Sequence, residues 1–287
     1  MGSFRFKQFE VVQDFSAMKV NTDAVLLGAW MSVPQCETAR VLDIGTGTGV
    51  IALMAGQRLS ENGVAAHIDA VEIDVDACKD ASANFDAAPW KGVSFELHNV
   101  PLQEYAGNAG GACESGGYDL IFSNPPYFIS SLKNDSQAKT TARHTDTLSQ
   151  RELLFYSTPL LKEGGTLAII LPVVEGEELL RKVEFMANAA AVAANATVAA
   201  SGGCRSTCSG DNSDTISNSA PGQLALFPSR ICYVHTVERK PAKRLMLEFV
   251  KCTPSNRPTM HREQLVMMSG GANTPEYAEL VGGFYLR

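Results

Sequence analysis

The sequence predicts one doubly wound α/β domain, whose mostly parallel, seven-stranded sheet ends in a C-terminal antiparallel hairpin. Three observations support this fold. Five short apolar runs alternate with helix-like segments, a glycine-rich turn follows the first run, and a Pro-Pro dipeptide ends the fourth. We expect the domain to span residues 1–287, with a low-complexity loop insertion at 187–222. There alanine and then serine, glycine and asparagine dominate, which leaves too little apolar surface to hold a fold.

The composition, 45% hydrophobic and 19% charged, is that of an ordinary globular protein. No apolar run is long enough to span a membrane and residues 1–10 lack a signal-peptide core, so we expect a cytoplasmic protein without membrane contact. Seven scattered cysteines argue against a disulfide framework. Cys204 and Cys208 lack partners at zinc spacing, so no metal site is expected. The net charge of −7 disfavours a large nucleic-acid surface but permits a local basic patch.

A glycine-rich turn follows the first predicted strand at residues 41–44 and precedes a predicted helix at 50–59. A dinucleotide fingerprint would need a third glycine at position 50, which is valine, and the Lys-Ser/Thr pair of a P-loop is absent. Gly45, Gly47 and Gly49 therefore favour close approach of an uncharged nucleoside with an amino-acid tail, and Asp43 would face a cationic group. S-adenosylmethionine has these parts.

Polar residues follow the next strands. The second strand, at 66–71, ends at Glu72, which could accept hydrogen bonds from both hydroxyls of a ribose, although an ordinary exposed acid is the simpler alternative. The third, at 93–97, is followed by Asn99, a candidate partner for an adenine amino group. Upstream, Thr22 or Asp23 would cap a helix at 24–31. That helix N-terminus could also hold a ligand carboxylate, and a plain cap is equally plausible.

The fourth strand, at 118–123, ends in Asn124-Pro125-Pro126-Tyr127. Proline cannot continue a ladder, so this turn lies at the carboxyl end of the strand, where α/β sheets bind ligands. The Asn124 amide oxygen and the Pro125 carbonyl are two acceptors that suit a planar NH2 group and would make its nitrogen more nucleophilic. Tyr127 could stack on a base, worth about 1–3 kcal/mol. Without the upstream glycine turn, a simple Pro-Pro stop would be the better interpretation.

Further elements are predicted as helices at 76–85, 101–105, 149–161 and 175–186, a strand at 166–171, and a hairpin of strands 231–237 and 244–250. The hairpin tip holds the densest basic cluster of the chain, Arg239, Lys240, Lys243 and Arg244. It is a candidate RNA contact, with a solvated tip as the alternative. The stretch 128–148 also carries basic residues that could meet phosphates, or it is a solvated loop. The apolar stripe of 277–286 is expected to dock on the domain.

The order of Asp43 with the glycine turn, Val71-Glu72 and Asn124-Pro125-Pro126-Tyr127 resembles the Rossmann-like class I S-adenosylmethionine-dependent N-methyltransferases. Residues 6–9, 18–30 and 284–286 are similar to the bacterial tRNA1(Val) (adenine-N6)-methyltransferases. The resemblance covers nearly the whole chain except 187–222. The Asn-Pro-Pro-Tyr turn is shared with glutamine, DNA-adenine and rRNA-guanine methyltransferases, so residues 18–30 carry the finer assignment. Asn21 stands where the family pattern has glycine.

The resemblance implies methyl transfer from S-adenosylmethionine to N6 of an adenine beside the tRNA anticodon, of the A37 type. No metal is needed because the donor sulfonium is already activated. Asn124, Pro125, Pro126 and Tyr127 would hold the adenine. The candidate cofactor residues are Lys19, Thr22, Asp43, Gly45, Gly47, Gly49, Glu72, Ile73 and Asn99. The alternatives are methylation of a protein glutamine, DNA adenine or rRNA guanine, and a non-catalytic S-adenosylmethionine-binding RNA module. The oligomeric state stays open, with a monomer as the default.

Overall fold

A nine-stranded sheet forms the centre of the computed structural model, which describes residues 2–108, 117–126, 148–201 and 224–286. The strand order is β11-β10-β8-β9-β7-β6-β3-β4-β5. The predicted fold class is confirmed, but the sheet has nine strands where seven were expected, because β10 and β11 extend the edge beyond β8. The strands of the sheet are β3 (Thr38–Ile44), β4 (Ala65–Val71), β5 (Val93–His98), β6 (Tyr118–Ser123), β7 (Leu161–Pro172), β8 (Ala225–Val237), β9 (Arg244–Cys252), β10 (His261–Ser269) and β11 (Ala272–Asn273).

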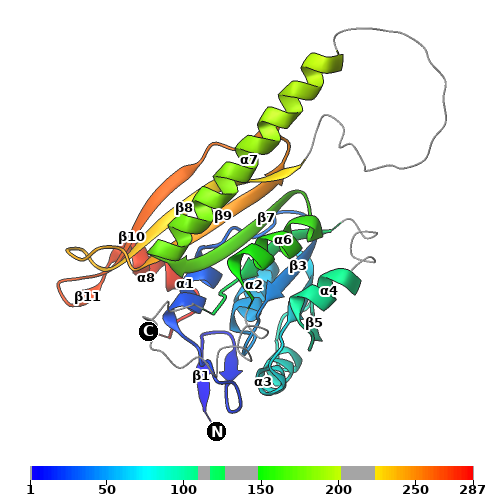
Figure 1. The fold of residues 1–287 in the computed structure, drawn as a ribbon. Coiled ribbons are helices and arrows are strands. Elements are labelled where there is room, and N and C mark those ends of the chain that lie inside the picture. Colours follow the sequence, from blue (N-terminus) through cyan, green and yellow to red (C-terminus); the bar gives the residue numbers. More distant parts are fainter. Residues whose placement is uncertain (1, 109–116, 127–147, 202–223, 287) are drawn as a thin grey trace, which may run out of the picture.

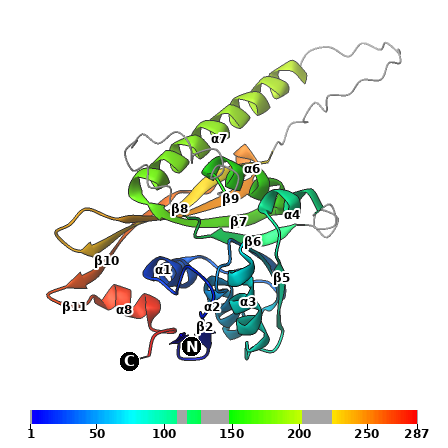
Figure 2. The ribbon, with the colours of Figure 1, turned by 60° about the horizontal axis from the view of Figure 1, so that its bottom comes forward.

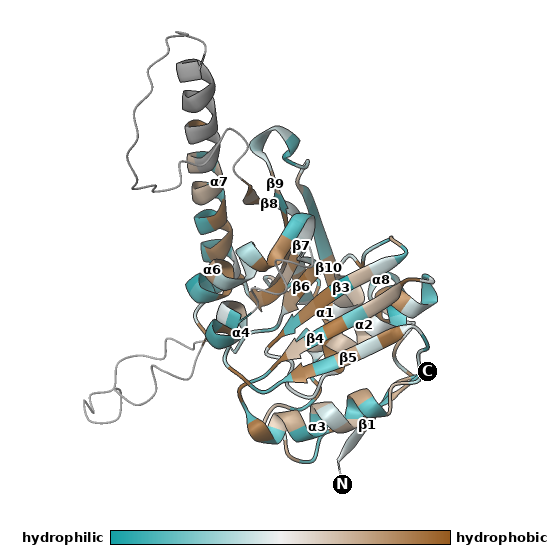
Figure 3. Cartoon of the chain, turned by 90° about the vertical axis from the view of Figure 1, so that its right-hand side faces the viewer, coloured by the Kyte–Doolittle hydropathy of each residue, from teal (hydrophilic) through white to brown (hydrophobic). Residues whose placement is uncertain are grey.

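Helices cover both faces of this sheet (Figures 1 and 2). One face carries α1 (Thr22–Trp30), α2 (Val50–Glu61), α3 (Val75–Asp86) and α8 (Pro275–Val281). The other carries α4 (Leu102–Asn108), α6 (Gln150–Leu160) and α7 (Val173–Ser201). Figure 3 shows apolar residues along the central strands, whereas the covering helices alternate between polar and apolar positions. The two apolar layers form separate cores on the two faces. No helix of the described residues is long and apolar enough to cross a membrane.

The carboxyl edge of the parallel strands gathers the predicted site segments. β3, β4, β5, β6 and β7 run parallel, so Ile44, Val71 and Ser123 end at the same edge. β9 runs antiparallel to β7 and its first residue, Arg244, pairs with Pro172 at the end of β7. The turn between β8 and β9 therefore lies at this edge too. The glycine turn, the Asn-Pro-Pro stop and the basic hairpin tip share one side of the molecule.

The helix α7 corrects the predicted boundary of the insertion. The sequence predicts a loop from residue 187, but α7 continues through Ser201. Alanine has the strongest intrinsic helix preference, so an alanine-rich run extends a helix even where it buries little surface. Ala187 itself is buried, 2% exposed, against Phe227 and Cys252. The remaining part of the expected insertion lies outside the described residues.

Other elements differ from the sequence prediction at their ends. Asn21, not Thr22 or Asp23, caps α1: its side chain accepts the backbone N–H of Ala24 at 2.9 Å. The helix predicted at 149–161 begins one residue later, because Ser149 is its cap, in a reciprocal capping box with Glu152. The N-terminal residues form a hairpin of β1 (Ser3–Arg5) and β2 (Glu10–Val12). The terminal stripe docks as expected, through the buried residues Tyr277, Val281 and Phe284.

Candidate functional site

A cavity of about 250 Å³ lies at the carboxyl edge of the sheet. Its walls come from the ends of β3, β4 and β6, from the segment before α1 and from the loop before α4. The lining residues are Ser16, Ala17, Met18, Ile44, Gly45, Gly47, Val71, Glu72, Ile73, Asp74, Ala77, Val100, Pro101, Leu102, Gln103, Ser123, Asn124, Pro125, Pro126 and Leu148. The cavity thus brings the glycine turn, the acid at the end of the second predicted strand and the Asn-Pro-Pro turn together.

The three glycines of the turn have two different roles. All have positive φ, +72° at Gly45, +57° at Gly47 and +80° at Gly49, which favours glycine. A Cβ on Gly45 or Gly47 would meet no atom within 4 Å, so these residues leave open space over the turn. A Cβ on Gly49 would lie 2.6 Å from the Phe85 ring. Gly49 therefore serves close packing of α2 against α3, and it does not line the cavity.

Glu72 is held rigidly at the end of β4. Its Oε2 accepts the backbone N–H of Gly47 at 2.9 Å, and its Oε1 accepts those of Ile73 and Asp74 at 2.8 and 2.9 Å. Asn99 lies behind this turn and donates to the carbonyls of Glu72 and Ile73 at 2.9 and 3.2 Å. Asn99 therefore positions the loop and is not among the cavity-lining residues. Glu72 and Ile73 both line the cavity.

Asp43 lies beneath the glycine turn and is fully buried. The Thr46 hydroxyl donates to its Oδ2 at 2.7 Å, while its Oδ1 makes no well-formed hydrogen bond with any described residue. Burial raises the pKa of Asp43 to about 7, and the nearby charge of Glu72 adds to the rise, while Thr46 and the backbone of Ala52 oppose it. Asp43 does not line the cavity, so its carboxylate shapes the turn from below.

The Asn-Pro-Pro turn closes the opposite side of the cavity. Ser123 donates to the carbonyl of Ile44 at 2.8 Å, which fixes the end of β6 against the end of β3. Asn124 is half-buried, Pro125 is buried and both line the cavity. Tyr127 lies outside the described residues, as do Lys133, Lys139, Arg143 and His144 of the expected basic loop.

The sequence predicts a cofactor contact from the start of α1 and the segment before it, but through other residues than those that line the cavity. Ser16, Ala17 and Met18 line the cavity, whereas the predicted Lys19 and Thr22 do not. Lys19 donates to the carbonyl of Gln13, and Thr22 is exposed at the start of α1. Asp80 of α3 fixes this segment by accepting the backbone N–H groups of residues 14, 15 and 16 at 3.1, 3.0 and 2.7 Å. Nothing in the local pattern around Asp80 signals these contacts.

The four basic residues of the hairpin tip differ in their surroundings. Arg239, Lys240 and Lys243 are exposed. Arg244 is half-buried and its Nε donates to Asp23 Oδ2 at 2.7 Å, which joins β9 to the first turn of α1. Three of the four predicted cations therefore face solvent at the edge that holds the cavity.

Comparison with known proteins gives the family. Residues 8–197 match the methyltransferase small domain family. The chain is 36% identical over 284 residues to the tRNA1(Val) (adenine(37)-N6)-methyltransferase of Trichodesmium erythraeum, covering 99% of this chain and 98% of that protein. It is 35% identical over 284 residues, with the same coverage, to the protein of that name from Parabacteroides distasonis.

Solved structures support the fold. A predicted O-methyltransferase from Agrobacterium tumefaciens superposes with a TM-score of 0.54 at 17% identity, over 91% of this chain and 96% of that one. A Listeria monocytogenes protein provisionally assigned to the class I S-adenosylmethionine-dependent methyltransferases gives a TM-score of 0.51 at 15% identity, over 95% and 73%. At these identities the likeness concerns the fold alone. With the full-length similarity above, the chain belongs to the methyltransferase small domain family and, within it, to the tRNA1(Val) (adenine(37)-N6)-methyltransferases.

Proposed function

We propose that this protein transfers a methyl group from S-adenosylmethionine to N6 of adenine 37 in tRNA1(Val). The observation that carries the proposal is that Gly45, Gly47 and Glu72 line the same cavity as Asn124 and Pro125. The first group suits a nucleoside with an amino-acid tail and the second suits a planar amino group. The relatives that match along almost the whole chain carry the same activity in their names. A tRNA substrate implies a cytoplasmic location.

The residues of the cavity fit S-adenosylmethionine. Open space over Gly45 and Gly47 permits close approach to the backbone. Oε2 of Glu72 accepts one backbone N–H, from Gly47, and can accept a further hydrogen bond from a ribose hydroxyl. Ile73 offers an apolar surface, 51% exposed, beside Glu72. The negative charges of Glu72 and Asp74 along the wall favour a cationic molecule. When bound, S-adenosylmethionine supplies a methyl group that its sulfonium has already activated.

Asn124 and Pro125 would act on the adenine amino group. The amide oxygen of Asn124 and the carbonyl of Pro125 each accept one N6 hydrogen. As N6 becomes tetrahedral, its hydrogens gain positive charge and these acceptors bind it more strongly. Interactions that strengthen in the transition state raise the rate of the chemical step. Fixed placement of N6 over the cavity supplies a further part of the acceleration.

Base access and phosphate binding complete the proposal. The target base must leave its stack, which costs a few kcal/mol and less in a loop than in a duplex. Arg239, Lys240 and Lys243 are exposed at the same edge of the sheet as the cavity. They would bind phosphates of the anticodon arm while the base enters the cavity.

Nucleoside mass spectrometry of tRNA1(Val) from cells with and without this protein tests the function. We expect N6-methyladenosine at position 37 to disappear when the protein is absent. In vitro, an unmodified transcript with adenine 37 should accept label from S-adenosylmethionine, while a matched transcript with guanine 37 should not. RNase treatment should remove the label. Label that survives RNase and disappears with protease would instead indicate a protein substrate.

A further inference from the structure

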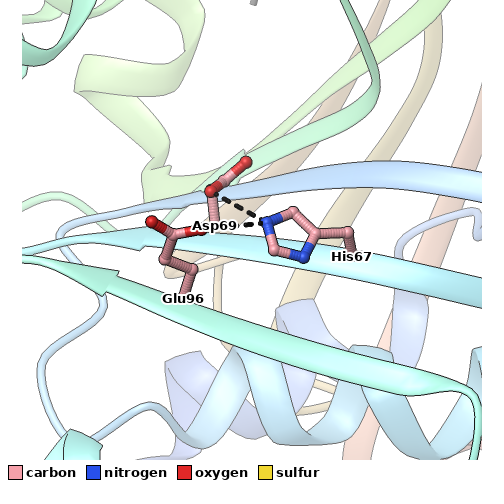
Figure 4. A group of neighbouring side chains, drawn as sticks. All are labelled: His67, Asp69 and Glu96. Atoms are coloured by element: carbon pink, nitrogen blue, oxygen red, sulfur yellow. Dashed lines mark ion pairs between the residues drawn. The ribbon is translucent and has the colours of Figure 1, made fainter.

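Two imidazoles and two carboxylates gather on the outer strands β4 and β5, on the face that carries α4. His67 and Asp69 alternate on β4 with Ala66 and Ile68, which pack into the core on the opposite face. Figure 4 shows His67, Asp69 and Glu96 pointing toward one another from the two neighbouring strands. One ligand atom of each lies within 4.8 Å of the other two. None of these residues lines the cavity described above.

The distances within the cluster lie in the range of an ion pair but are longer than those of a direct charge-assisted hydrogen bond. His67 Nε2 lies 3.3 Å from Asp69 Oδ1 and 3.4 Å from Glu96 Oε2. A charged N–H···O hydrogen bond is shorter, about 2.7–2.9 Å. Zinc in a tetrahedral site binds nitrogen and oxygen at about 2.0–2.1 Å, which separates neighbouring ligand atoms by about 3.3–3.4 Å. The His67 distances match the edges of such a tetrahedron.

The surrounding hydrogen bonds orient His67 as a ligand. The Ser94 hydroxyl lies 3.4 Å from the carbonyl of Ala66, to which it donates, so its oxygen can accept the Nδ1–H of His67 at 2.9 Å. In the neutral ring this leaves a lone pair on Nε2, the nitrogen that faces the two carboxylates. A lone pair facing two anions is repulsive unless a cation lies between them. A proton or a metal ion can supply that charge.

Neighbouring side chains also orient the carboxylate of Asp69. Its Oδ2 is held by Arg40 at 3.2 Å and by the Tyr118 hydroxyl at 2.6 Å, so Oδ1 is the oxygen directed at the imidazoles. His98 Nε2 lies 3.0 Å from Oδ1 and fixes it from the other side. Asp69 is almost fully buried, whereas the His67 and Glu96 side chains are 38% and 59% exposed. Outer partners that fix a first ligand, together with an open approach from solvent, are typical of metal sites.

We propose that His67, Asp69 and Glu96 bind one zinc ion, which links β4 to β5. One imidazole nitrogen and two carboxylate oxygens are ligands that zinc accepts, and water would complete the tetrahedron. The ion would stabilise this side of the sheet just before Glu72 and Asn99, which shape the cavity. The ion would take no part in methyl transfer, because none of its ligands lines the cavity.

Zinc titration of the full-length, tag-free protein tests the site, after chelator treatment and alkylation of its thiols so that cysteines cannot bind the ion. The variants His67→Asn and Glu96→Gln each remove one ligand at a partly exposed position, so folding should be retained. His261→Asn, at an exposed histidine that begins β10, is the matched control. Calorimetry should show one zinc ion bound by the unchanged protein and by the control. Each ligand variant should bind it at least about ten-fold more weakly.

Two further measurements distinguish a site from an ion-pair cluster. Zinc should raise the thermal unfolding midpoint of the unchanged protein and of the control, but not of either ligand variant. Magnesium should have no such effect because it disfavours imidazole. Equal zinc affinity in all four proteins would place the ion elsewhere and overturn the proposal. Failure of the unchanged protein to bind zinc would equally overturn it and leave the cluster as an ion pair.

Discussion

At the scale of single residues, Asn124 and Asp43 carry different parts of the site. Asn124 lines the cavity at the end of β6, where a substrate amino group would enter. Asp43 lies below the glycine turn, with Thr46 as its hydrogen-bond partner. A change at Asn124 should therefore affect the chemical step, and a change at Asp43 should affect the turn.

Asn124→Ala should lower kcat by several powers of ten while S-adenosylmethionine affinity stays within a few-fold. The lost acceptor would be most valuable in the transition state, when the hydrogens on N6 gain charge. Single-turnover methylation and calorimetry measure the two effects separately. Asn62→Ala, at the exposed end of α2, is the control and should change neither. Lost cofactor affinity with an unchanged rate at saturating cofactor would mean that Asn124 does not act on the base.

Asp43→Asn should flatten the pH dependence of stability. The pKa of Asp43 in the native state, about 7, lies above the ordinary value of 3.8, so the native state holds an extra proton between these pH values. This contribution to stability is complete below pH 3.8 and is lost as the pH rises through about 7. We compare the fall in unfolding free energy from pH 5 to pH 8 for the two ligand-free proteins. This fall should be smaller in the variant than in the unchanged protein, and the difference should be roughly 2–3 kcal/mol. Urea unfolding at pH 5 and at pH 8 measures this difference. Equal falls in the two proteins would mean that the pKa of Asp43 is not raised in the native state.

At the scale of elements, α7 combines a packed part with a part that extends away from the sheet (Figure 1). Ala187 and Ala225 belong to one small apolar cluster with Phe227 and Cys252. The chain leaves the domain on α7 and returns on β8 beside the same cluster. The packed part of α7 thus ends near Ala187, and not where the helix ends.

Deleting residues 190–221, with a short Gly/Ser join, should leave folding and methylation nearly intact. The join would connect two points that pack in one cluster, and a change of loop length has a small entropic cost. A longer deletion of 187–222 removes Ala187 and should lower the unfolding midpoint further. Thermal unfolding and turnover of both proteins provide the comparison. A large loss of turnover in the shorter deletion would show that the removed segment has a function.

At the scale of the whole molecule, antiparallel β9 places a basic tip at the edge of the sheet that holds the cavity. Its first residue pairs with the end of β7, and Arg244 joins it to Asp23 of α1. Arg239, Lys240 and Lys243 are thereby exposed at the same edge of the sheet as the cavity, although they lie far from Asn124 in the sequence.

Changing Arg239, Lys240 and Lys243 to alanine should raise KM for tRNA and reduce its salt dependence, without affecting S-adenosylmethionine affinity. Each lost phosphate contact lowers the number of counterions released on binding. Arg244 is left unchanged because its ion pair with Asp23 is structural. Lys91→Ala, an exposed change just before β5 at the opposite edge, is the control. An unaltered KM for tRNA in the triple variant would mean that the hairpin tip is a solvated turn that does not contact tRNA.

The two anchors of the site could be predicted from sequence because each depends on local geometry. The conformation of Gly45–Gly49 depends on a short stretch of chain: a strand ends, glycines with positive φ make the turn, and a helix begins. The Pro125-Pro126 dipeptide ends β6 because proline has no backbone N–H to donate to a neighbouring strand. Parallel strands then bring both anchors to one edge, which needs only the order of elements.

Only the tertiary structure decided which polar groups face the cavity and which support it. The sequence predicts Asn99, Gly49 and Asp43 at the cofactor. None of them lines the cavity in the structure: Asn99 donates to a loop, Gly49 packs on Phe85 and Asp43 lies beneath the turn. The hydrogen bonds of Asp80 to the segment before α1 join residues more than 60 positions apart. Local sequence sets backbone conformation, because φ and ψ respond to neighbouring residues. The direction and burial of a side chain depend on packing against distant segments, which no local pattern contains.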